Sequence, residues 1–392
     1  MKIGFDVSQT GQAKCGCGYF ADGLIRELAA IDCVNEYLLY PAVGDLFWDP
    51  ESAATFSCDR PNFRRLSLPT DFEASRQFWR KPQPNLEQTL GSPDVFHANN
   101  YYCPLGLRNA RMLYTLYDLS FLHEPRWSTE RNRVGCFEGV FRASWSADFF
   151  IAISRSTRKH FLSTFPHVAE DRIALVYPGS RFEYLAAPAR PERLRSLKPG
   201  GFWLAVGTIE PRKNYPRLLD AYRLLQARNA DSLPLVIAGG KGWLCEDFNA
   251  QLHGMEPDRD LFLLGYVSDM ELSWLFQNCF AFVYPSLFEG FGMPVLEALG
   301  FGSPVLCSQT SSLPEVGGDA AIYFDPMESE SIAQAMSGLL RGDLSRERLK
   351  EAARHQAKQF SWTSSAAKAR EVYEEVVKRP KVREGRFSAA AD

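Results

Sequence analysis

Short apolar runs alternate with amphipathic helical stretches along almost the whole chain, and this alternation limits the fold more than any other feature of the sequence. Such runs are typical of parallel strands that are buried on both faces. The predicted strands are, in chain order, 3–7, 37–40, 95–96, 112–116, 149–153, 174–177, 202–206, 235–238, 261–264, 280–284, 304–307 and 321–324. Strands separated by helices form parallel sheets, so the predicted fold class is α/β.

The length of the chain indicates two domains. Its 392 residues are enough for two hydrophobic cores. Residues 187–200 are rich in proline and charge and fit a linker between domains. We therefore predict an N-terminal domain over 1–190, a C-terminal domain over 200–363 and a charged tail over 379–392. Two doubly wound domains facing each other would leave a cleft at the carboxyl ends of their strands.

The composition argues against several functional classes. A chain that is 45% hydrophobic and 23% charged, with a net charge of -3, is typical of globular proteins and not of nucleic-acid binders. The N-terminus does not resemble a signal peptide, and no apolar run approaches the roughly 20 residues of a membrane span. Nine scattered cysteines favour reduced thiols. We expect a cytoplasmic protein whose only membrane contact would be peripheral, at the inner face.

Two glutamates, Glu289 and Glu297, lie on either side of a glycine-rich turn. The preceding strand ends in a loop with Gly290 and Gly292, and Pro294 suits the first turn of a helix. A helix entered through glycines presents backbone N–H groups to a phosphate. A phosphate repels carboxylates, so we expect both glutamates to accept hydrogen bonds from sugar hydroxyls. The alternative is an ordinary turn with two solvated acids.

A second polar loop follows the strand 202–206. It contains Arg212 and Lys213 just before a predicted helix. Adjacent cations at the carboxyl end of a strand can neutralise a diphosphate that departs as a leaving group. The alternative is a solvated basic turn.

The segment between the two glutamates resembles the E-x7-E signature of family 4 of the retaining glycosyltransferases, which Glu289 and Glu297 match. The resemblance implies the GT-B architecture, with two doubly wound Rossmann-like domains facing across a cleft. It implies that Glu289 contacts the sugar of a nucleotide-sugar donor and that Glu297 contacts the nucleotide ribose. It also implies that a terminal helix at about 364–378 crosses back onto the N-terminal domain. The residues assigned to donor binding between the glutamates are Gly290, Phe291, Gly292 and Met293.

Other loops match the same family. The resemblance assigns donor contacts to Gly16 and Gly18 over the phosphates, to Gly207, Arg212 and Lys213 at the diphosphate, to Gly240 in a cleft loop and to Tyr266 near the base. Many members have an arginine directly after the glycine that Gly207 matches. This chain has Thr208 there, so one usual cation is absent or Arg212 has taken over its work.

The N-terminal half contains the segments that match the family's acceptor-facing residues. His97 matches a segment that faces the acceptor, and we weigh a catalytic role against a structural one. Tyr117 and Asp118 match a place where most relatives have His-Asp and where the histidine touches the donor sugar, so the resemblance assigns both residues to donor binding. A tyrosine can donate a hydrogen bond but cannot supply an imidazole's charge. Ser154 is predicted to cap a helix.

We expect a retaining glycosyltransferase that moves a hexose from a nucleotide diphosphate to a saccharide or lipid-linked saccharide, as in bacterial surface polysaccharide synthesis. Mannose from GDP-mannose is favoured over UDP-hexoses. The catalytic groups would be Glu289, Lys213, Arg212 and His97. Without a convincing nucleophile, a front-face mechanism is expected, in which the leaving phosphate helps take the acceptor proton.

We expect no cofactor and no metal. Asp258-Arg259-Asp260 has the form of the metal motif of a different glycosyltransferase fold, but it lies in a polar turn and is predicted to be solvated loop. Three alternatives stay open: a nucleotide-sugar epimerase of the same architecture, a non-catalytic sugar-nucleotide binding module, and a glycoside hydrolase that uses the two glutamates.

Overall fold

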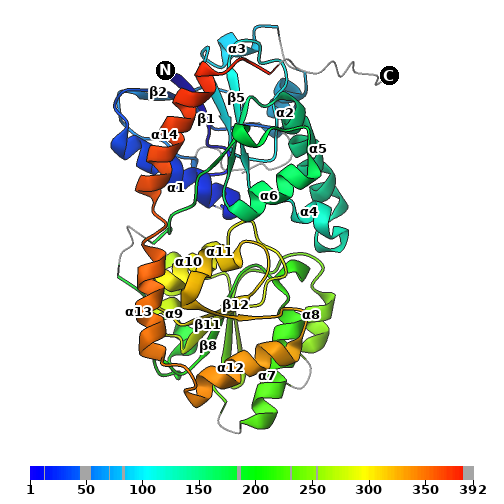
Figure 1. The fold of residues 1–392 in the computed structure, drawn as a ribbon, viewed down its shortest axis with the longest axis vertical. Coiled ribbons are helices and arrows are strands. Elements are labelled where there is room, and N and C mark those ends of the chain that lie inside the picture. The colour runs from blue at the N-terminus through cyan, green and yellow to red at the C-terminus, as the bar shows by residue number, and fades with distance from the viewer. Residues whose placement is uncertain are drawn as a thin grey trace. The chain divides into compact units, whose positions relative to one another are not determined.

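The computed structural model of the protein describes residues 1–12, 14–44, 54–69, 71–81, 84–182, 187–229, 232–252 and 255–382. The chain divides into two compact units. The first unit consists of Met1–His123, Glu130–Gly179 and the chain from Ser361 onward, and the second consists of Glu124–Thr129 and Ser180–Phe360. Each unit is an α/β structure with helices packed on a parallel sheet (Figure 1).

Within the described residues, the first unit contains a seven-stranded parallel sheet in the order β3-β2-β1-β4-β5-β6-β7. Its strands are β1 (Lys2–Asp6), β2 (Glu36–Tyr40), β3 (Phe63–Arg65), β4 (Val95–Ala98), β5 (Arg111–Leu116), β6 (Phe149–Ala152) and β7 (Ile173–Leu175). Its helices are α1 (Gly16–Ile31), α2 (Phe72–Arg80), α3 (Leu86–Thr89), α4 (Ser120–His123), α5 (Glu130–Ser146), α6 (Arg155–Thr164) and α14 (Trp362–Lys378). The strand order reverses between β1 and β4, which is where doubly wound sheets bind ligands.

The second unit repeats this topology. Its described part contains a six-stranded parallel sheet in the order β10-β9-β8-β11-β12-β13. The strands are β8 (Trp203–Val206), β9 (Leu235–Ala238), β10 (Leu261–Gly265), β11 (Ala281–Tyr284), β12 (Val305–Ser308) and β13 (Ala321–Phe324). The helices are α7 (Tyr215–Arg228), α8 (Glu246–Gln251), α9 (Asp269–Asn278), α10 (Met293–Gly300), α11 (Leu313–Gly317), α12 (Ser329–Arg341) and α13 (Arg346–Ala357). Here the switch point lies between β8 and β11.

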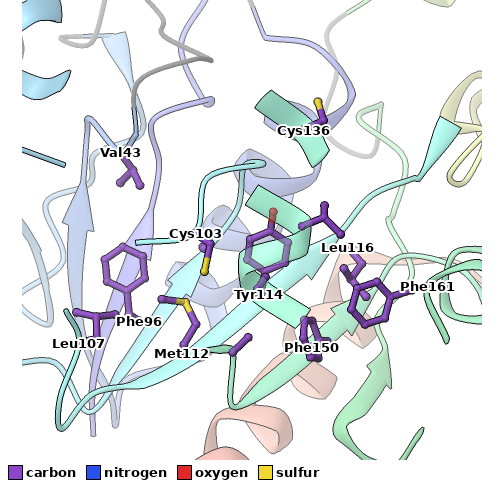
Figure 2. Close-up of a cluster of buried hydrophobic side chains, with 14 of the residues drawn as sticks. Val43, Phe96, Cys103, Leu107, Met112, Tyr114, Leu116, Cys136, Phe150 and Phe161 are labelled. Atoms are coloured by element: carbon purple, nitrogen blue, oxygen red, sulfur yellow. The ribbon is translucent and has the colours of Figure 1, made fainter. Parts of the chain in front are cut away.

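The hydrophobic cores explain why the strands read as continuous apolar runs. In the first unit, side chains of β4, β5 and β6 pack between the sheet and its helices, as Figure 2 shows for Phe96, Met112, Tyr114 and Phe150. Every residue of β8, β9, β11 and β12 in the second unit is buried. The alternation seen in the sequence therefore predicted both sheets correctly. It missed β3, a short and charged edge strand that stacks Phe63 on Tyr37.

The predicted division of the chain differs from the observed one at Glu124–Thr129, which belongs to the second unit, and at the boundary between the two predicted domains. The boundary lies after Gly179 and not near 190, and the presumed linker 187–200 packs within the second unit. There the backbone N–H of Ala189 donates to Met270 O at 3.0 Å, and the guanidinium of Arg190 lies 5.1 Å from the Trp274 ring centroid. This segment, although rich in proline and arginine, thus packs on α9 of the second unit.

The terminal helix α14 begins at Trp362, two residues before the predicted start, because Ser361 caps it. It packs on α1 of the first unit, where the Trp362 and Phe20 rings lie 5.9 Å apart. A Cβ on Gly23 would lie 2.3 Å from the Trp362 ring, so α1 needs glycine at this crossing. Of the predicted tail, residues 383–392 lie outside the described residues. No helix in the described part of the chain has the length and hydropathy of a membrane span.

Candidate active site

The centre of the candidate site is the carboxylate of Glu289, which lies in the loop between β11 and α10. Its Oε1 is 2.6 Å from Lys213 Nζ and accepts hydrogen bonds from Tyr284 Oη at 2.8 Å and Ser286 Oγ at 2.5 Å. Its Oε2 is 2.9 Å from Arg212 Nη1. A carboxylate offers about four acceptor positions, two on each oxygen. Oε1 thus has three protein partners within hydrogen-bond distance, and Oε2 contacts the Arg212 guanidinium.

The charge of Glu289 depends on its two cations. Burial would raise its pKa, but Arg212 and Lys213 outweigh burial and hold the pKa at about 2. The carboxylate is ionised at neutral pH and is a weak base. With Glu289 only 8% exposed and Glu297 only 1% exposed, the alternative of two solvated acids does not hold.

Arg212 and Lys213 come from the 3-10 helix η5 (Pro211–Lys213), which follows β8. The guanidinium of Arg212 also donates to Glu210 Oε1 at 2.6 Å and to Phe288 O at 2.7 Å. Both cationic side chains are mostly buried, with 17% and 12% of their surfaces exposed. The alternative interpretation of Arg212 and Lys213 as a solvated basic turn therefore does not hold either.

The η5 segment is tied to the end of β11 by Asn214. This residue has a left-handed backbone with φ of 60°, and its side-chain amide donates to Pro285 O at 3.0 Å. The same amide donates to Pro326 O at 2.8 Å. These bonds join the loops after β8, β11 and β13, so the cations and the carboxylate are held at one edge of the sheet.

Glycines allow the close packing of this edge. Gly207 has a φ of +143°, and a Cβ there would lie 3.4 Å from Lys213 Cε. Gly292 has a φ of +104° at the N-cap of α10. Gly240 differs, because a Cβ there would meet no heavy atom within 4 Å. Packing within the protein gives no reason for glycine at 240, and Thr208 is exposed beside this loop.

The loop between Glu289 and α10 is held by serines of the next connection. The backbone N–H of Glu289 donates to Ser311 Oγ at 2.9 Å, and Ser312 Oγ donates to Phe291 O at 2.8 Å. Pro294 lies in the first turn of α10, as predicted. These bonds hold the loop that leads into α10, whose first residue is Met293.

Glu297 lies inside α10, and its partner was not foreseen. Its Oε1 is 2.8 Å from Arg181 Nε, and its Oε2 accepts from Arg181 Nη2 at 3.0 Å. Burial raises the pKa of Glu297, while Arg181 opposes the rise. Arg181 also lies 3.4 Å from Asp269. Arg181 lies within the predicted N-terminal domain 1–190, so its distance in sequence from Glu297 gave no signal of this ion pair.

Several candidates in the first unit have structural partners. Tyr117 is buried, and its hydroxyl donates to Asn99 O at 2.8 Å, so the predicted contact of this hydroxyl with a sugar donor is not supported. Asp118 accepts from the backbone N–H of Ser120 at 2.9 Å at the start of α4. A Cβ on Gly18 would lie 2.0 Å from Gln9 O, which explains the glycine without a ligand.

Gly16 begins α1, and a Cβ there would meet nothing within 4 Å. In the second unit, Tyr266 is 77% exposed. Neither position has a packing reason for its residue type, and their assigned contacts stay predictions. Ser154 caps α6 as predicted, accepting from the Thr157 N–H at 2.9 Å.

His97 is fully buried in the first unit. Its Nδ1 lies 2.8 Å from Tyr373 Oη of α14, and its Nε2 lies 2.9 Å from Thr115 Oγ1. Burial lowers the pKa of His97 to about 3, so the ring is neutral. With both nitrogens engaged and no exposed surface, this geometry contradicts a catalytic role and favours the structural one.

The remaining motif, Asp258-Arg259-Asp260, is polar loop. Asp258 pairs with Arg193 at 2.6 Å and has a φ of 58°. The described residues contain no cluster of three or more histidine, cysteine, aspartate or glutamate side chains that could hold a metal ion. All nine cysteines are free thiols.

Comparisons with known proteins agree with this arrangement. The family model described as Glycosyl transferases group 1 matches residues 190–356. The O-antigen chain mannosyltransferase B of Escherichia coli is 34% identical over 95% of this chain and 99% of its own length. A serotype-specific mannosyltransferase, WbdA of Escherichia coli, is 34% identical over 56% of this chain and 28% of its length.

The crystal structure of the Anabaena protein HepE with UDP and glucose resembles the fold, with a TM-score of 0.68 at 17% identity. The match covers 96% of this chain and all of that one. The two parallel α/β units fit the GT-B fold. The chain belongs to the glycosyl transferases group 1 family and is a glycosyltransferase.

Proposed function

We propose that this protein is a retaining mannosyltransferase, which transfers mannose from GDP-mannose to a saccharide or lipid-linked saccharide in bacterial surface polysaccharide synthesis. The observation that carries the proposal is the buried cluster of Glu289, Arg212 and Lys213 at the switch point of the second sheet. The mannose assignment is supported by the two mannosyltransferases described above, one of which matches nearly the whole chain.

Lys213 and Arg212 would stabilise the diphosphate as it leaves. The ion pairs with Glu289 partly balance the charges of both cations and hold their side chains in place for a diphosphate. The α10 helix, which begins at Met293 behind Gly292, adds the positive end of its dipole. Glu297 would accept hydrogen bonds from the ribose, sharing its carboxylate with Arg181.

The geometry supports a front-face displacement. The bond between the anomeric carbon and the diphosphate oxygen breaks, the acceptor oxygen bonds to the same face of that carbon, and the acceptor proton goes to a diphosphate oxygen. Glu289 is a poor candidate for a covalent nucleophile, because its pKa is about 2 and four protein groups contact it. The same low pKa argues against a glycoside hydrolase in which Glu289 supplies the acid.

No metal is required in this proposal, because the protein's own cations neutralise the leaving group. Transfer should continue when a chelator such as EDTA is added. Abolition of transfer by the chelator, with recovery on adding a divalent cation, would contradict the metal-independent proposal.

The proposal is tested with a panel of GDP-, UDP-, ADP- and dTDP-sugars, measuring thermal stabilisation and sugar transfer to mannose-containing acceptors. GDP-mannose should stabilise the protein selectively and be consumed only when an acceptor is present. Stabilisation by UDP-sugars alone would refute the GDP-mannose assignment. Sugar rearrangement without an acceptor would indicate an epimerase, and donor binding without turnover would indicate a binding module.

A further inference from the structure

The second unit contains a cavity of about 630 Å³ beside the η5 loop. One wall is the segment Glu124–Thr129, hereafter the strap, which packs on the second unit although it comes from the middle of the first unit's sequence. The other walls are the loops after β8 and β9, the start of α8, and Met327 after β13. Cavities of this volume hold ligands of a few sugar rings or similar size. Neither the signature glutamates nor the diphosphate cations line it.

Two apolar side chains that line this cavity are exposed. Leu244 is 48% exposed and Met327 is 55% exposed. Leu244 has a left-handed backbone with φ of 53°, which is uncommon for a leucine and points to a local constraint. Trp127 of the strap is half-buried beside them, and its carbonyl oxygen accepts from Trp243 Nε1 at 2.9 Å. An apolar surface is thus held in place at the mouth of the cavity.

The polar side chains of the cavity are mainly acidic. Glu124, Glu210, Glu246 and Asp247 line it, against Arg126 and Arg217. Arg126 is held by Glu124 at 2.8 Å. Among the described residues, the carboxylates of Glu246 and Asp247 have no hydrogen-bond or ion-pair partner. Exposed carboxylates accept hydrogen bonds from hydroxyls and repel phosphates, so the chemistry favours a neutral, hydroxyl-rich ligand.

A saccharide has this combination of properties. Its C–H faces pack on tryptophan and aliphatic side chains, and its hydroxyls donate to carboxylates. We propose that the cavity is a saccharide subsite that holds hexose residues of the acceptor chain away from the reacting hydroxyl. The acceptor identity rests on the proposed mannosyl transfer, whereas saccharide binding itself does not.

The cavity is connected to the candidate active site through one arginine. Glu210 is 5% exposed, lines the cavity and lies 2.6 Å from Arg212 Nη2. Arg212 Nη1 lies 2.9 Å from Glu289. A saccharide that hydrogen-bonds Glu210 would redistribute the charge around Arg212. Binding of a saccharide and of the donor nucleotide should therefore be coupled, and the coupling must be reciprocal.

The experiment uses the full chain with mannotriose as the probe. Saturation-transfer NMR and calorimetric titration measure binding to wild type and to the double variant Glu246→Gln/Asp247→Asn, in the absence and presence of saturating GDP. Both substituted residues are exposed and have no hydrogen-bond or ion-pair partner in the described part of the chain, so folding should be unaffected. We expect about tenfold weaker mannotriose binding in the double variant, which corresponds to the loss of charge-assisted hydrogen bonds. Glu330→Gln, on α12 and outside the cavity lining, is the matched control and should bind as wild type.

Further outcomes separate this proposal from the proposed function. Glu289→Gln should lose transfer but still bind mannotriose, because Glu289 does not line the cavity. Saturating GDP should change the affinity of wild type for mannotriose by some factor. Saturating mannotriose should change its affinity for GDP by the same factor. Three results would each overturn the proposed subsite. The double variant could bind mannotriose as tightly as wild type does, GDP could displace mannotriose completely, or the cavity could bind spermidine in place of mannotriose.

Discussion

Replacing Glu289 by glutamine removes the charge at the centre of the candidate site while keeping the shape of its side chain. In wild type, the carboxylate has a pKa of about 2 in place of the ordinary 4.5 because two cations outweigh its burial. A pKa difference of this size means that ionised Glu289 stabilises the folded state by roughly 3 kcal/mol at neutral pH. We therefore expect Glu289→Gln to lower the free energy of unfolding by about 3 kcal/mol at pH 7.

The pH dependence follows from the direction of the pKa change. Because the folded-state pKa is depressed, the stabilisation is complete above the unfolded-state pKa and is lost as the pH falls towards about 2. The advantage of wild type over Glu289→Gln should shrink to about 2.5 kcal/mol at pH 4 and about 1.5 kcal/mol at pH 3. The difference should be constant above about pH 6.

The assay is urea unfolding followed by tryptophan fluorescence at several pH values. Glu330→Gln serves as a control, because Glu330 pairs with Arg228 on the surface and its loss should leave stability unchanged within error. A Glu289→Gln variant as stable as wild type at pH 7 would refute the reasoning. A loss of stability that is the same at pH 7 and pH 3 would show that the ion pairs are not its cause.

Other substitutions test single contacts. Arg181→Met leaves the buried Glu297 without its partner and should lower the free energy of unfolding by about 3–5 kcal/mol in the same urea assay. The double variant Arg181→Met/Glu297→Met should recover much of this lost free energy. His97→Gln should cost about 1–3 kcal/mol of stability yet keep kcat within a few-fold, and a hundredfold loss of kcat in a folded variant would restore the catalytic role. Gly207→Ala strains a backbone at φ of +143° beside Lys213 and should weaken GDP binding measured by calorimetry, whereas Gly240→Ala, which meets no protein atom, should change the fold's stability little.

Much of the fold follows from local patterns. Buried parallel strands and the helices between them impose their periods on the sequence, so most strands were predicted within a residue or two. Strand β3 was missed because Phe63-Arg64-Arg65 is too short and too charged for such a pattern. The linker was misassigned because proline and arginine mark loops without revealing that the loop packs on α9.

The site residues show where prediction from sequence ends. Spacing around glycines led to Glu289, Arg212 and Lys213 as candidates, and the structure brings the three side chains together, because a strand-loop-helix unit places such residues at the carboxyl edge of a sheet. Motif spacing could not show that Arg181 pairs with Glu297 across 116 positions of sequence. Nor could it show that the hydroxyl of Tyr373, on the last helix, contacts the ring of His97. Such partners depend on tertiary packing, which leaves no regular spacing.

The central claim is that the cluster of Glu289, Arg212 and Lys213 transfers mannose from GDP-mannose with retention. The most direct measurement is proton NMR of the product formed from GDP-mannose and a mannose-containing acceptor by wild type and by Lys213→Met. The account predicts an α-linked mannoside from wild type and a rate lower by about 10²–10³-fold in the folded variant, because one cation no longer stabilises the leaving diphosphate. An inverted β-linked product, or full activity in Lys213→Met, would contradict it.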